Sequence, residues 1–261
     1  MSERAPVVVK LGGSLLEDAT ARGKLLTAIA LRAASGESLV LVHGGGKRID
    51  ASLAERGIPK RTHAGLRITD AETLEVVVAA LTAVNRGLVE ELEERGAMPT
   101  GLSGVDGGVV RADLHPPVDG VELGHVGVVT RVEARVFEAM RSAAFLPVLA
   151  PLAAGPEGSP LNVNADAVAA AVAAALSARR LIFLTDVEGV ADAFGKRIDE
   201  LDAVAARRLL ESPAVTGGMR PKLTACLEAA ANGVGEVVIA GPSRQRAALS
   251  GGRGGTHVLP D

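Results

Sequence analysis

The chain is best read outward from Val7-Val8-Val9-Lys10-Leu11-Gly12-Gly13-Ser14. Three β-branched residues in a row predict a short, fully apolar strand, and such strands usually lie in the middle of a parallel sheet. A lysine and two glycines follow at once, which places a positive charge and bare backbone N–H groups at the carboxyl end of the strand. Open α/β sheets bind their ligands at that edge. Taken alone, the stretch does not require a ligand site. A buried strand followed by a glycine turn, with Lys10 reaching solvent, explains it equally well.

Apolar strands and amphipathic helices alternate along the rest of the chain. We expect further strands at residues 38–42, 98–102, 109–111, 126–130, 145–150, 181–184, 235–240 and 256–259. We expect helices at residues 17–34, 48–56, 70–95, 132–142, 167–178 and 198–210, with a last one opened by Thr216-Gly217-Gly218-Met219-Arg220-Pro221-Lys222. Residues 60–69 read as a polar loop, and the strands at 109–111 and 126–130 suit an antiparallel hairpin over the site.

This alternation predicts the α/β class, as a three-layer αβα sandwich with an open, mainly parallel central sheet. No linker cuts the chain cleanly, but a soft boundary lies near residues 151–160, which are rich in proline and glycine. We therefore expect an N-terminal lobe at residues 1–155 and a C-terminal lobe at residues 156–261, both built on one continuous sheet.

Composition narrows the class of partner. The 261 residues are 48% hydrophobic but only 2% aromatic, and their net charge is −3, which indicates neither nucleic acid nor an anionic membrane as a ligand. The single cysteine, Cys226, excludes an internal disulfide and a cysteine-rich metal site, and it suits a reducing cytoplasm. We expect it to be a small buried thiol in a helix. No apolar run is long enough to span a membrane, and the polar N-terminal residues do not resemble a signal peptide.

A second glycine cluster, His43-Gly44-Gly45-Gly46-Lys47, joins the strand at 38–42 to a helix. A helix N-terminus with bare amides attracts negative charge, so this order of elements indicates phosphate binding. The chain has no G-x-x-x-x-G-K-[ST] motif, and Ile49 occupies the last glycine position of G-x-G-x-x-G, so neither nucleotide fingerprint fits. His43 could be catalytic, but packing at the strand end is the simpler interpretation.

The helix at residues 70–95, capped by Asp70, is more apolar than a single core-facing stripe requires. Burial on two sides within the chain would account for this pattern, and so would a subunit interface, which we slightly favour. The residues concerned are Leu74, Val76, Val77, Val78, Leu81 and Val84.

The segment Asn162-Val163-Asn164-Ala165-Asp166 leads from an extended stretch into an alanine-rich helix. Alternation along the extended part puts Asn162 and Asn164 on one face. From these residues alone, the simpler interpretation of Asp166 is a helix cap.

Seven motifs, in this order, resemble the amino acid kinase family, and within it the kinases that act on N-acetyl-L-glutamate. The resemblance extends from Val7 to Leu259, and no single motif would be specific. The motifs are Val9-Lys10-Leu11-Gly12-Gly13, Val42-His43-Gly44-Gly45-Gly46, Gly65-Leu66-Arg67-Ile68-Thr69, Gly101-Leu102-Ser103-Gly104, Asn162-Val163-Asn164-Ala165-Asp166, Thr185-Asp186-Val187-Glu188-Gly189-Val190 and Gly217-Gly218-Met219-Arg220-Pro221-Lys222.

The resemblance implies that ATP phosphorylates the side-chain carboxylate of N-acetyl-L-glutamate, the second step of arginine biosynthesis. Lys10 and Lys222 would hold the phosphoryl oxygens, and Asp166 would fix both ammonium groups. The amides of Gly12, Gly45 and Gly46 would line the phosphate path. Mg²⁺ would be carried by the nucleotide.

The same resemblance divides the remaining site residues between two ligands. Arg67 would clamp the α-carboxylate of the substrate, and Asn162 would bond its N-acyl-amino end. The resemblance also implies that the N-terminal lobe binds the amino acid and the C-terminal lobe the nucleotide. The substrate set is Gly45, Gly46, Arg67, Asn162 and Asn164. The ATP set is Gly12, Gly13, Asp186, Gly189, Gly217 and Met219.

Other functions stay open at this point. They are a kinase of a carrier-protein-bound aminoadipate or glutamate, a kinase of N-succinylglutamate, and a non-catalytic nucleotide or amino-acid sensor. We expect a cytoplasmic homodimer joined through the helix at residues 70–95. We also expect no inhibition by arginine, because Met1–Pro6 is too short for a packing helix and residues 250–256 contain no carboxylate.

Overall fold

The computed structural model describes residues 5–13, 15–192, 194–212, 215 and 217–259. Ser14, Thr216 and residues 1–4, which the sequence analysis used, lie outside the described residues. Within them one sheet has 11 strands, and a separate hairpin has two. The strands are β1 (Val7–Leu11), β2 (Leu39–His43), β3 (Thr62–His63), β4 (Leu66–Arg67), β5 (Pro99–Gly104), β6 (Val110–Leu114), β7 (Val126–Val132), β8 (Leu146–Ala154), β9 (Pro160–Val163), β10 (Arg180–Leu184), β11 (Glu200–Leu201), β12 (Val237–Ala240) and β13 (Thr256–Val258).

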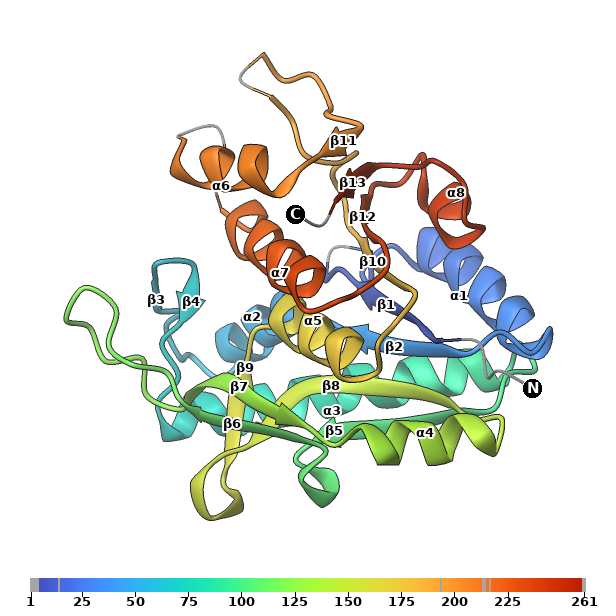
Figure 1. The fold of residues 1–261 in the computed structure, drawn as a ribbon. Coiled ribbons are helices and arrows are strands. Elements are labelled where there is room, and N and C mark those ends of the chain that lie inside the picture. Colours follow the sequence, from blue (N-terminus) through green and yellow to red (C-terminus); the bar gives the residue numbers. More distant parts are fainter. Residues whose placement is uncertain (1–4, 14, 193, 213–214, 216, 260–261) are drawn as a thin grey trace.

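Helices cover both faces of the sheet (Figure 1). They are α1 (Ala19–Ala34), α2 (Gly46–Glu55), α3 (Ala71–Glu93), α4 (Ala134–Ser142), α5 (Ala165–Ala175), α6 (Ala203–Glu211), α7 (Met219–Ala231) and α8 (Gln245–Leu249), with short 3₁₀ turns at Asp106–Gly108 and Pro156–Gly158. One hydrophobic core joins α4, α5, α6 and α7 to the sheet, and a second joins α1, α8 and the end of α3 to its other face. The predicted three-layer αβα sandwich is therefore confirmed.

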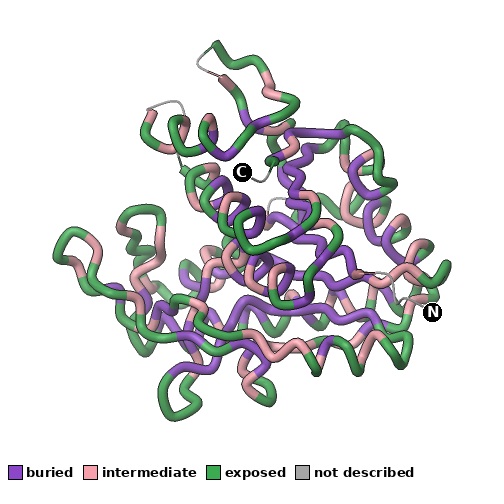
Figure 2. The backbone as a smooth tube through the Cα atoms, viewed as in Figure 1, coloured by how far each residue is buried: buried purple, intermediate pink, exposed green. Residues whose placement is uncertain are grey.

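Strand β1 lies at the centre of the sheet, as its apolar run predicts. It pairs in parallel with β10 on one side and with β2 on the other, and β12 and β8 extend the parallel part outward. Its alternate residues Val7, Val9 and Leu11 face the core under α1, whereas Val8 faces the core under α5. Alternation places Lys10 on the same side as Val8, toward α5 and α7. The buried strands run between the two helix layers in Figure 2.

Strand β8 is longer than the sequence predicts, because Pro151 is tolerated at an irregular position. It extends to Ala154, although Pro151 would be expected to end a strand. Its pairing with β5 shifts register between Ser103 and Gly104, which face Ala150 and Ala153. The missing N–H of Pro151 therefore falls at a bulge, where the ladder does not need it.

Two further segments differ from expectation. The predicted polar loop at residues 60–69 contains the β3–β4 hairpin, whose two-residue turn places Ala64 at φ 48° and Gly65 at φ 81°. Positive φ at both central residues is typical of a tight hairpin turn, and an Ala-Gly pair is a weak signal for it. The first part of the predicted helix at 198–210 contains β11, and α6 begins only at Ala203. Helix α8 has only five residues, too few for a periodic pattern.

Helix α3 starts at its predicted cap, where the Asp70 side chain accepts a hydrogen bond from the Thr73 amide. Most of its surplus apolar residues, such as Val77 and Leu81, are buried within the chain, so they do not require a partner. The homodimer stays a prediction.

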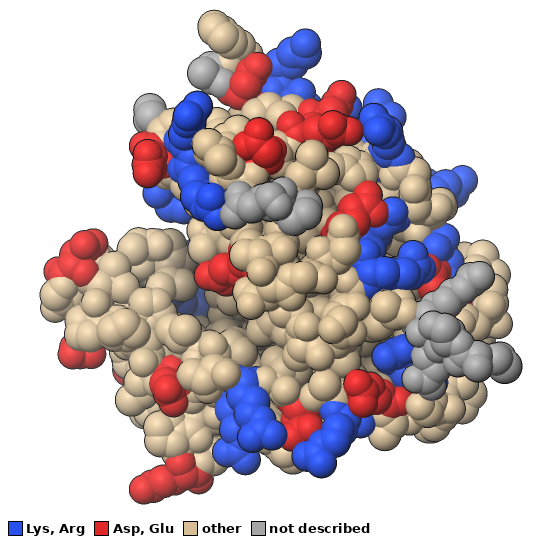
Figure 3. Space-filling view, viewed as in Figure 1, with Lys and Arg blue, Asp and Glu red and all other residues tan. Residues whose placement is uncertain are grey.

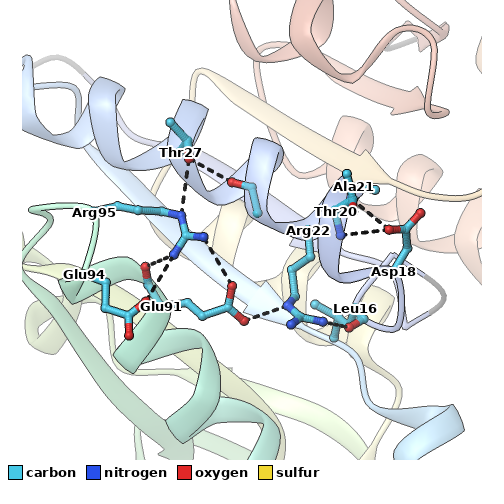
Figure 4. Close-up of polar contacts among 10 residues, drawn as sticks. Leu16, Asp18, Thr20, Ala21, Arg22, Thr27, Glu91, Glu94 and Arg95 are labelled. Atoms are coloured by element: carbon cyan, nitrogen blue, oxygen red, sulfur yellow. Dashed lines mark hydrogen bonds and ion pairs between the residues drawn. The ribbon is translucent and has the colours of Figure 1, made fainter.

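An ion-pair network also ties α3 to α1 (Figure 4). Arg22 Nε lies 2.7 Å from Glu91 Oε1, and Arg95 Nε donates to Thr27 Oγ1 at 3.3 Å. These contacts join two helices on the same face of the sheet, and they fix the end of α3 that is remote from its Asp70 cap.

His43, at the end of β2, is a packing residue. It is fully buried, its Nδ1 lies 2.8 Å from the Gly44 carbonyl oxygen, and its Nε2 lies 3.1 Å from Asn85 Nδ2. Only the neutral ring with its proton on Nδ1 satisfies both contacts. Burial, opposed by the Gly44 carbonyl and helped by the Lys10 charge, lowers the pKa of His43 to about 4.

We predict that this histidine makes folding pH-dependent. An unfolded chain protonates it below its ordinary pKa of about 6.5, whereas the folded chain does not until about pH 4. Its share of the free energy of unfolding should therefore fall by roughly 1 kcal/mol per pH unit between pH 6 and 4.5. Urea unfolding of the wild type and of His43→Gln across this range measures the difference between the two slopes. Identical slopes would contradict the buried neutral ring.

Candidate active site

The carboxyl ends of β1 and β2 meet the N-terminus of α2, and glycines make the approach possible. Gly45 is the N-cap of α2, and a Cβ built on it would lie 2.6 Å from Leu81 Cδ2. A Cβ on Gly13 would lie 3.5 Å from the Gly46 nitrogen, so the two glycine clusters are in contact. Amides in the first turn of a helix have no partner within it. Together with the helix dipole they form an anion-binding position.

The position of Gly12 corrects one expectation. Its N–H donates to the Leu184 carbonyl at 2.8 Å, because the pairing of β1 with β10 continues one residue beyond the strand. That amide is used by the sheet and does not line a phosphate path. Gly44 is used in the same way, since its N–H donates to Leu11 at 2.9 Å. The glycines that line the cavity are Gly13, Gly44, Gly45, Gly46 and Gly65.

A buried ion cluster lies beside these glycines. Lys10 Nζ is 2.7 Å from Asp166 Oδ1, and Lys222 Nζ is 3.1 Å from both carboxylate oxygens of Asp166. The three residues come from β1, α5 and α7, and each is at most 7% exposed. Lys222 also lies over the Phe183 ring, 5.4 Å from its centroid. Residues far apart in the sequence thus meet at one carboxylate.

The electrostatics of this cluster favour an anionic ligand. Burial raises the pKa of the Asp166 carboxyl, but the ammonium groups of Lys10 and Lys222 outweigh it and hold that pKa below its ordinary value. Burial lowers the pKa of Lys10, although Asp166 opposes the shift. With two ammonium groups and one carboxylate charged, the cluster carries a surplus positive charge away from water, which an anion would compensate.

Asp166 is not the cap of α5, which corrects the simpler interpretation from the sequence. The N-cap is Asn164, whose Oδ1 accepts from the Asp166 and Ala167 amides at 2.8 and 3.3 Å. Because Asn164 performs the capping, the Asp166 side chain can turn inward to the two lysines. Its negative charge in the first turn also suits the helix dipole.

The β3–β4 hairpin brings Arg67 to the wall of the same cavity. Arg67 Nη2 contacts Asp50 Oδ1 of α2, and Lys60 Nζ lies 2.8 Å from Asp50 Oδ2. Arg67 Nη1 is buried, and it has no hydrogen-bond partner among the residues that the structure describes. A buried guanidinium N–H without a partner is costly, so this side of the cavity also favours an anion.

A hydroxyl links Arg67 to Asn162. The buried Thr69 Oγ1 donates to the Arg67 carbonyl at 2.8 Å and accepts from Asn162 Nδ2 at 3.1 Å. Strand β9, which carries Asn162, is thus tied to the hairpin strand that carries Arg67, and both residues line the same cavity.

One cavity of about 430 Å³ takes in most of the predicted site, and Figure 3 shows the surface hollowed between the hairpin and α5. Lys222 joins it through Asp166. The predicted site residues along its wall are Lys10, Gly13, Gly45, Gly46, Arg67, Asn162, Asn164 and Asp166. The predicted site residues did not include Lys47 and Asp50, which line the cavity. Nor did they include Lys60 and Thr69, which contact the lining residues Asp50 and Asn162. The one signal for Asp50 was its place one helical turn after Gly46.

Of the residues predicted for the nucleotide, only Gly13 lines this cavity. Asp186 follows the carboxyl end of β10, and Thr185 Oγ1 donates to its Oδ1 at 3.1 Å. Gly189 has φ 142° and packs on Thr256, while Gly217 and Met219 stand at the start of α7. Their role in binding ATP stays a prediction.

No group of three histidine, cysteine, aspartate or glutamate side chains in the part of the chain that the structure describes could hold a metal ion. No described helix is long and apolar enough to cross a membrane. Cys226 is buried in α7, and burial raises the pKa of its thiol, so it is the packing residue that the sequence predicted.

Comparison with known proteins gives concordant matches. The profile of the amino acid kinase family matches residues 5–241. The acetylglutamate kinase of Solibacter usitatus is 40% identical over 257 residues, which cover 97% of this chain and 98% of the relative. That of Agrobacterium fabrum is 39% identical over 247 residues, covering 91% and 84%. The crystal structure of smu.665 from Streptococcus mutans superposes with a TM-score of 0.86 at 32% identity, covering 99% of this chain and all of that one.

We predict that Asp166→Asn destabilises the fold, because it leaves two ammonium groups buried without a compensating charge. Breaking a buried ion pair in this way typically costs about 3–5 kcal/mol. Denaturant unfolding measures the loss. As a control, the triple variant Lys10→Met, Asp166→Leu, Lys222→Met should unfold with at least wild-type free energy. A change below about 0.5 kcal/mol in Asp166→Asn, within the range of ordinary surface substitutions, would show that the cluster is not buried as described.

Proposed function

We propose that this chain, which belongs to the amino acid kinase family, transfers the γ-phosphoryl group of ATP to the side-chain carboxylate of N-acetyl-L-glutamate. The products are ADP and N-acetyl-L-glutamyl 5-phosphate, an intermediate of arginine biosynthesis. The observation that carries the proposal is one cavity whose wall combines several anion-binding groups. Lys10, the glycine amides and Arg67 line it, and Lys222 joins Lys10 behind it through Asp166.

The reaction needs electrostatic help more than proton transfer. The attacking carboxylate has an ordinary pKa near ~4.3 and is already ionised at pH 7, so no general base is required. The barrier lies in bringing two anions together and in stabilising charge on the phosphoryl group as it moves. Two ammonium groups fixed by Asp166, beside the amides of Gly45 and Gly46, are suited to that task.

The cavity would hold the amino acid by its other charged group. Arg67 would pair with the α-carboxylate, which would give its buried Nη1 the partner that it lacks. Asn162, held by Thr69, would bond the N-acyl-amino group. The side-chain carboxylate is then left to approach Lys10.

The nucleotide would approach the same edge of the sheet from the side of β10 and α7, where Asp186, Gly189, Gly217 and Met219 lie. Mg²⁺, when bound, neutralises charge on the ATP phosphates, and we propose that it arrives with the nucleotide. The chain's own contribution at the phosphates would then be Lys10, Lys222 and the amides of Gly13, Gly45 and Gly46.

The lining of a neighbouring cavity indicates which N-acyl group the substrate carries. About 380 Å³ in volume, this cavity shares Leu66 and Asn164 with the main cavity and runs between β7 and α5 to Glu228 and Asn232. Its lining contains the carboxylate of Glu228 but no lysine or arginine, so the free carboxylate of a succinyl group would be repelled there. This favours N-acetyl over N-succinyl substrates.

A coupled ADP-release assay tests the proposal. Purified protein is offered ATP with N-acetyl-L-glutamate, N-succinyl-L-glutamate, L-glutamate or L-aspartate. We expect turnover of N-acetyl-L-glutamate and a kcat/KM at least about tenfold lower for the succinyl compound, which corresponds to ~1.4 kcal/mol of discrimination. Turnover of free glutamate or aspartate without turnover of the N-acyl compounds would refute the proposal, and an absence of ATP-dependent turnover would favour a sensor.

A further inference from the structure

Asp50 is an unexpected side chain in a cavity that favours anions. It lines the cavity with Lys10, Lys47 and Arg67, and its carboxylate would repel a dianionic amino acid and ATP alike. The attacking carboxylate needs no base, so proton transfer does not explain its presence. Asp50 must therefore act on a neighbouring group or serve only the fold.

The contacts of Asp50 indicate that it acts on a neighbouring group. One oxygen contacts Arg67 Nη2, and the other lies 2.8 Å from Lys60 Nζ. Burial raises the pKa of Asp50, but Lys60 and Arg67 outweigh it and hold that pKa below its ordinary value. The Arg67 side chain is only 12% exposed, whereas Asp50 is 34% exposed and Lys60 54%. The three charges thus form a row from solvent toward the cavity, with arginine innermost.

This row has the same form as the cluster around Asp166. There Asp166 holds Lys10 and Lys222, and here Asp50 holds Lys60 and Arg67. A guanidinium is planar, so fixing Nη2 also restricts where Nη1 can lie. Asp50 stands on α2 four residues after Gly46, so one rigid helix connects this anchor to the amides of its first turn.

We propose that Asp50 is a positioning residue, which holds the Arg67 fork ready for the α-carboxylate of the substrate. Lys60 fixes Asp50 from the solvent side. The proposal rests on the proposed function for the identity of the ligand. The positioning of Arg67 by Asp50 does not depend on it, because it concerns contacts that are present without a substrate.

The possible roles of Asp50 predict different changes in KM for the variant Asp50→Asn. If Asp50 positions Arg67, the KM for N-acetyl-L-glutamate rises about tenfold or more, while kcat and the KM for ATP stay within about twofold. If Asp50 only repels anions, that KM falls. If it serves only the fold, thermal stability drops and both KM values move together. The last two results would each overturn the proposal.

A double-mutant cycle shows whether the effect passes through Arg67. Arg67→Lys alone should raise the same KM, because an ammonium cannot reproduce a planar fork. Adding Asp50→Asn to Arg67→Lys should then raise it by less than about twofold, since residues that act as a unit are not additive. Asp50→Glu should restore part of the wild-type KM. Glu55→Gln, which removes an exposed charge from the same helix, is the matched control and should behave as wild type. Additive effects would overturn the proposal.

Crystal structures without substrate decide the positioning claim independently of activity. We expect Arg67 in one conformation in the wild type and displaced, or in several conformations, in Asp50→Asn. An unchanged Arg67 would overturn the proposal. Failure of the proposed function looks different, because the wild type would then not turn over N-acetyl-L-glutamate, while the Arg67 conformations in the two crystals would still differ.

Discussion

The site depends on one carboxylate placed between two buried ammonium groups. Asp166 joins β1 to α7 through Lys10 and Lys222, and α5 must begin where it does for this carboxylate to face inward. Lysines are rarely buried unless they are paired. The layers of the sandwich bring the three residues together, and hydrophobic burial on both sides of β1 offsets the desolvation of their charges. In the proposed reaction, the resulting surplus of positive charge would stabilise the phosphoryl group.

A second carboxylate contacts cations at the same cavity. Asp50 contacts Arg67 and Lys60, so both clusters consist of two cations joined by an aspartate. Charges that are positioned before the substrate arrives need no reorganisation during the reaction, which is why they stabilise a transition state better than mobile ones. Helix α2 carries both the amides at Gly46 and the anchor at Asp50. The distance from the first-turn amides to the Asp50 anchor is therefore set by one helix.

Sequence reasoning predicted best those features that one strand or one helix determines locally. The apolar run at Val7–Leu11 predicts the central strand. The alternation of side chains along that strand then places Lys10 on the side of α5. Sequence reasoning failed where a contact with a residue distant in sequence determines the role of a side chain or amide. Asp166 reads as a cap until Asn164 is seen to occupy that position, and the Gly12 amide is used by Leu184 of β10. Asp50 gave almost no signal, because its role requires the hairpin strand β4, which a polar segment with an Ala-Gly turn scarcely indicates.

The central claim is that fixed charge beside the phosphoryl group drives the transfer, and the rate of Lys222→Met tests it most directly. Methionine keeps the length and much of the volume of the lysine stem, so the variant removes the charge with little change in packing. In the coupled ADP-release assay the account predicts that kcat falls by ~100–1,000-fold, while the KM for N-acetyl-L-glutamate changes little. A variant that retains more than about half of the wild-type kcat, which is less than ~0.5 kcal/mol of lost transition-state stabilisation, would contradict the account.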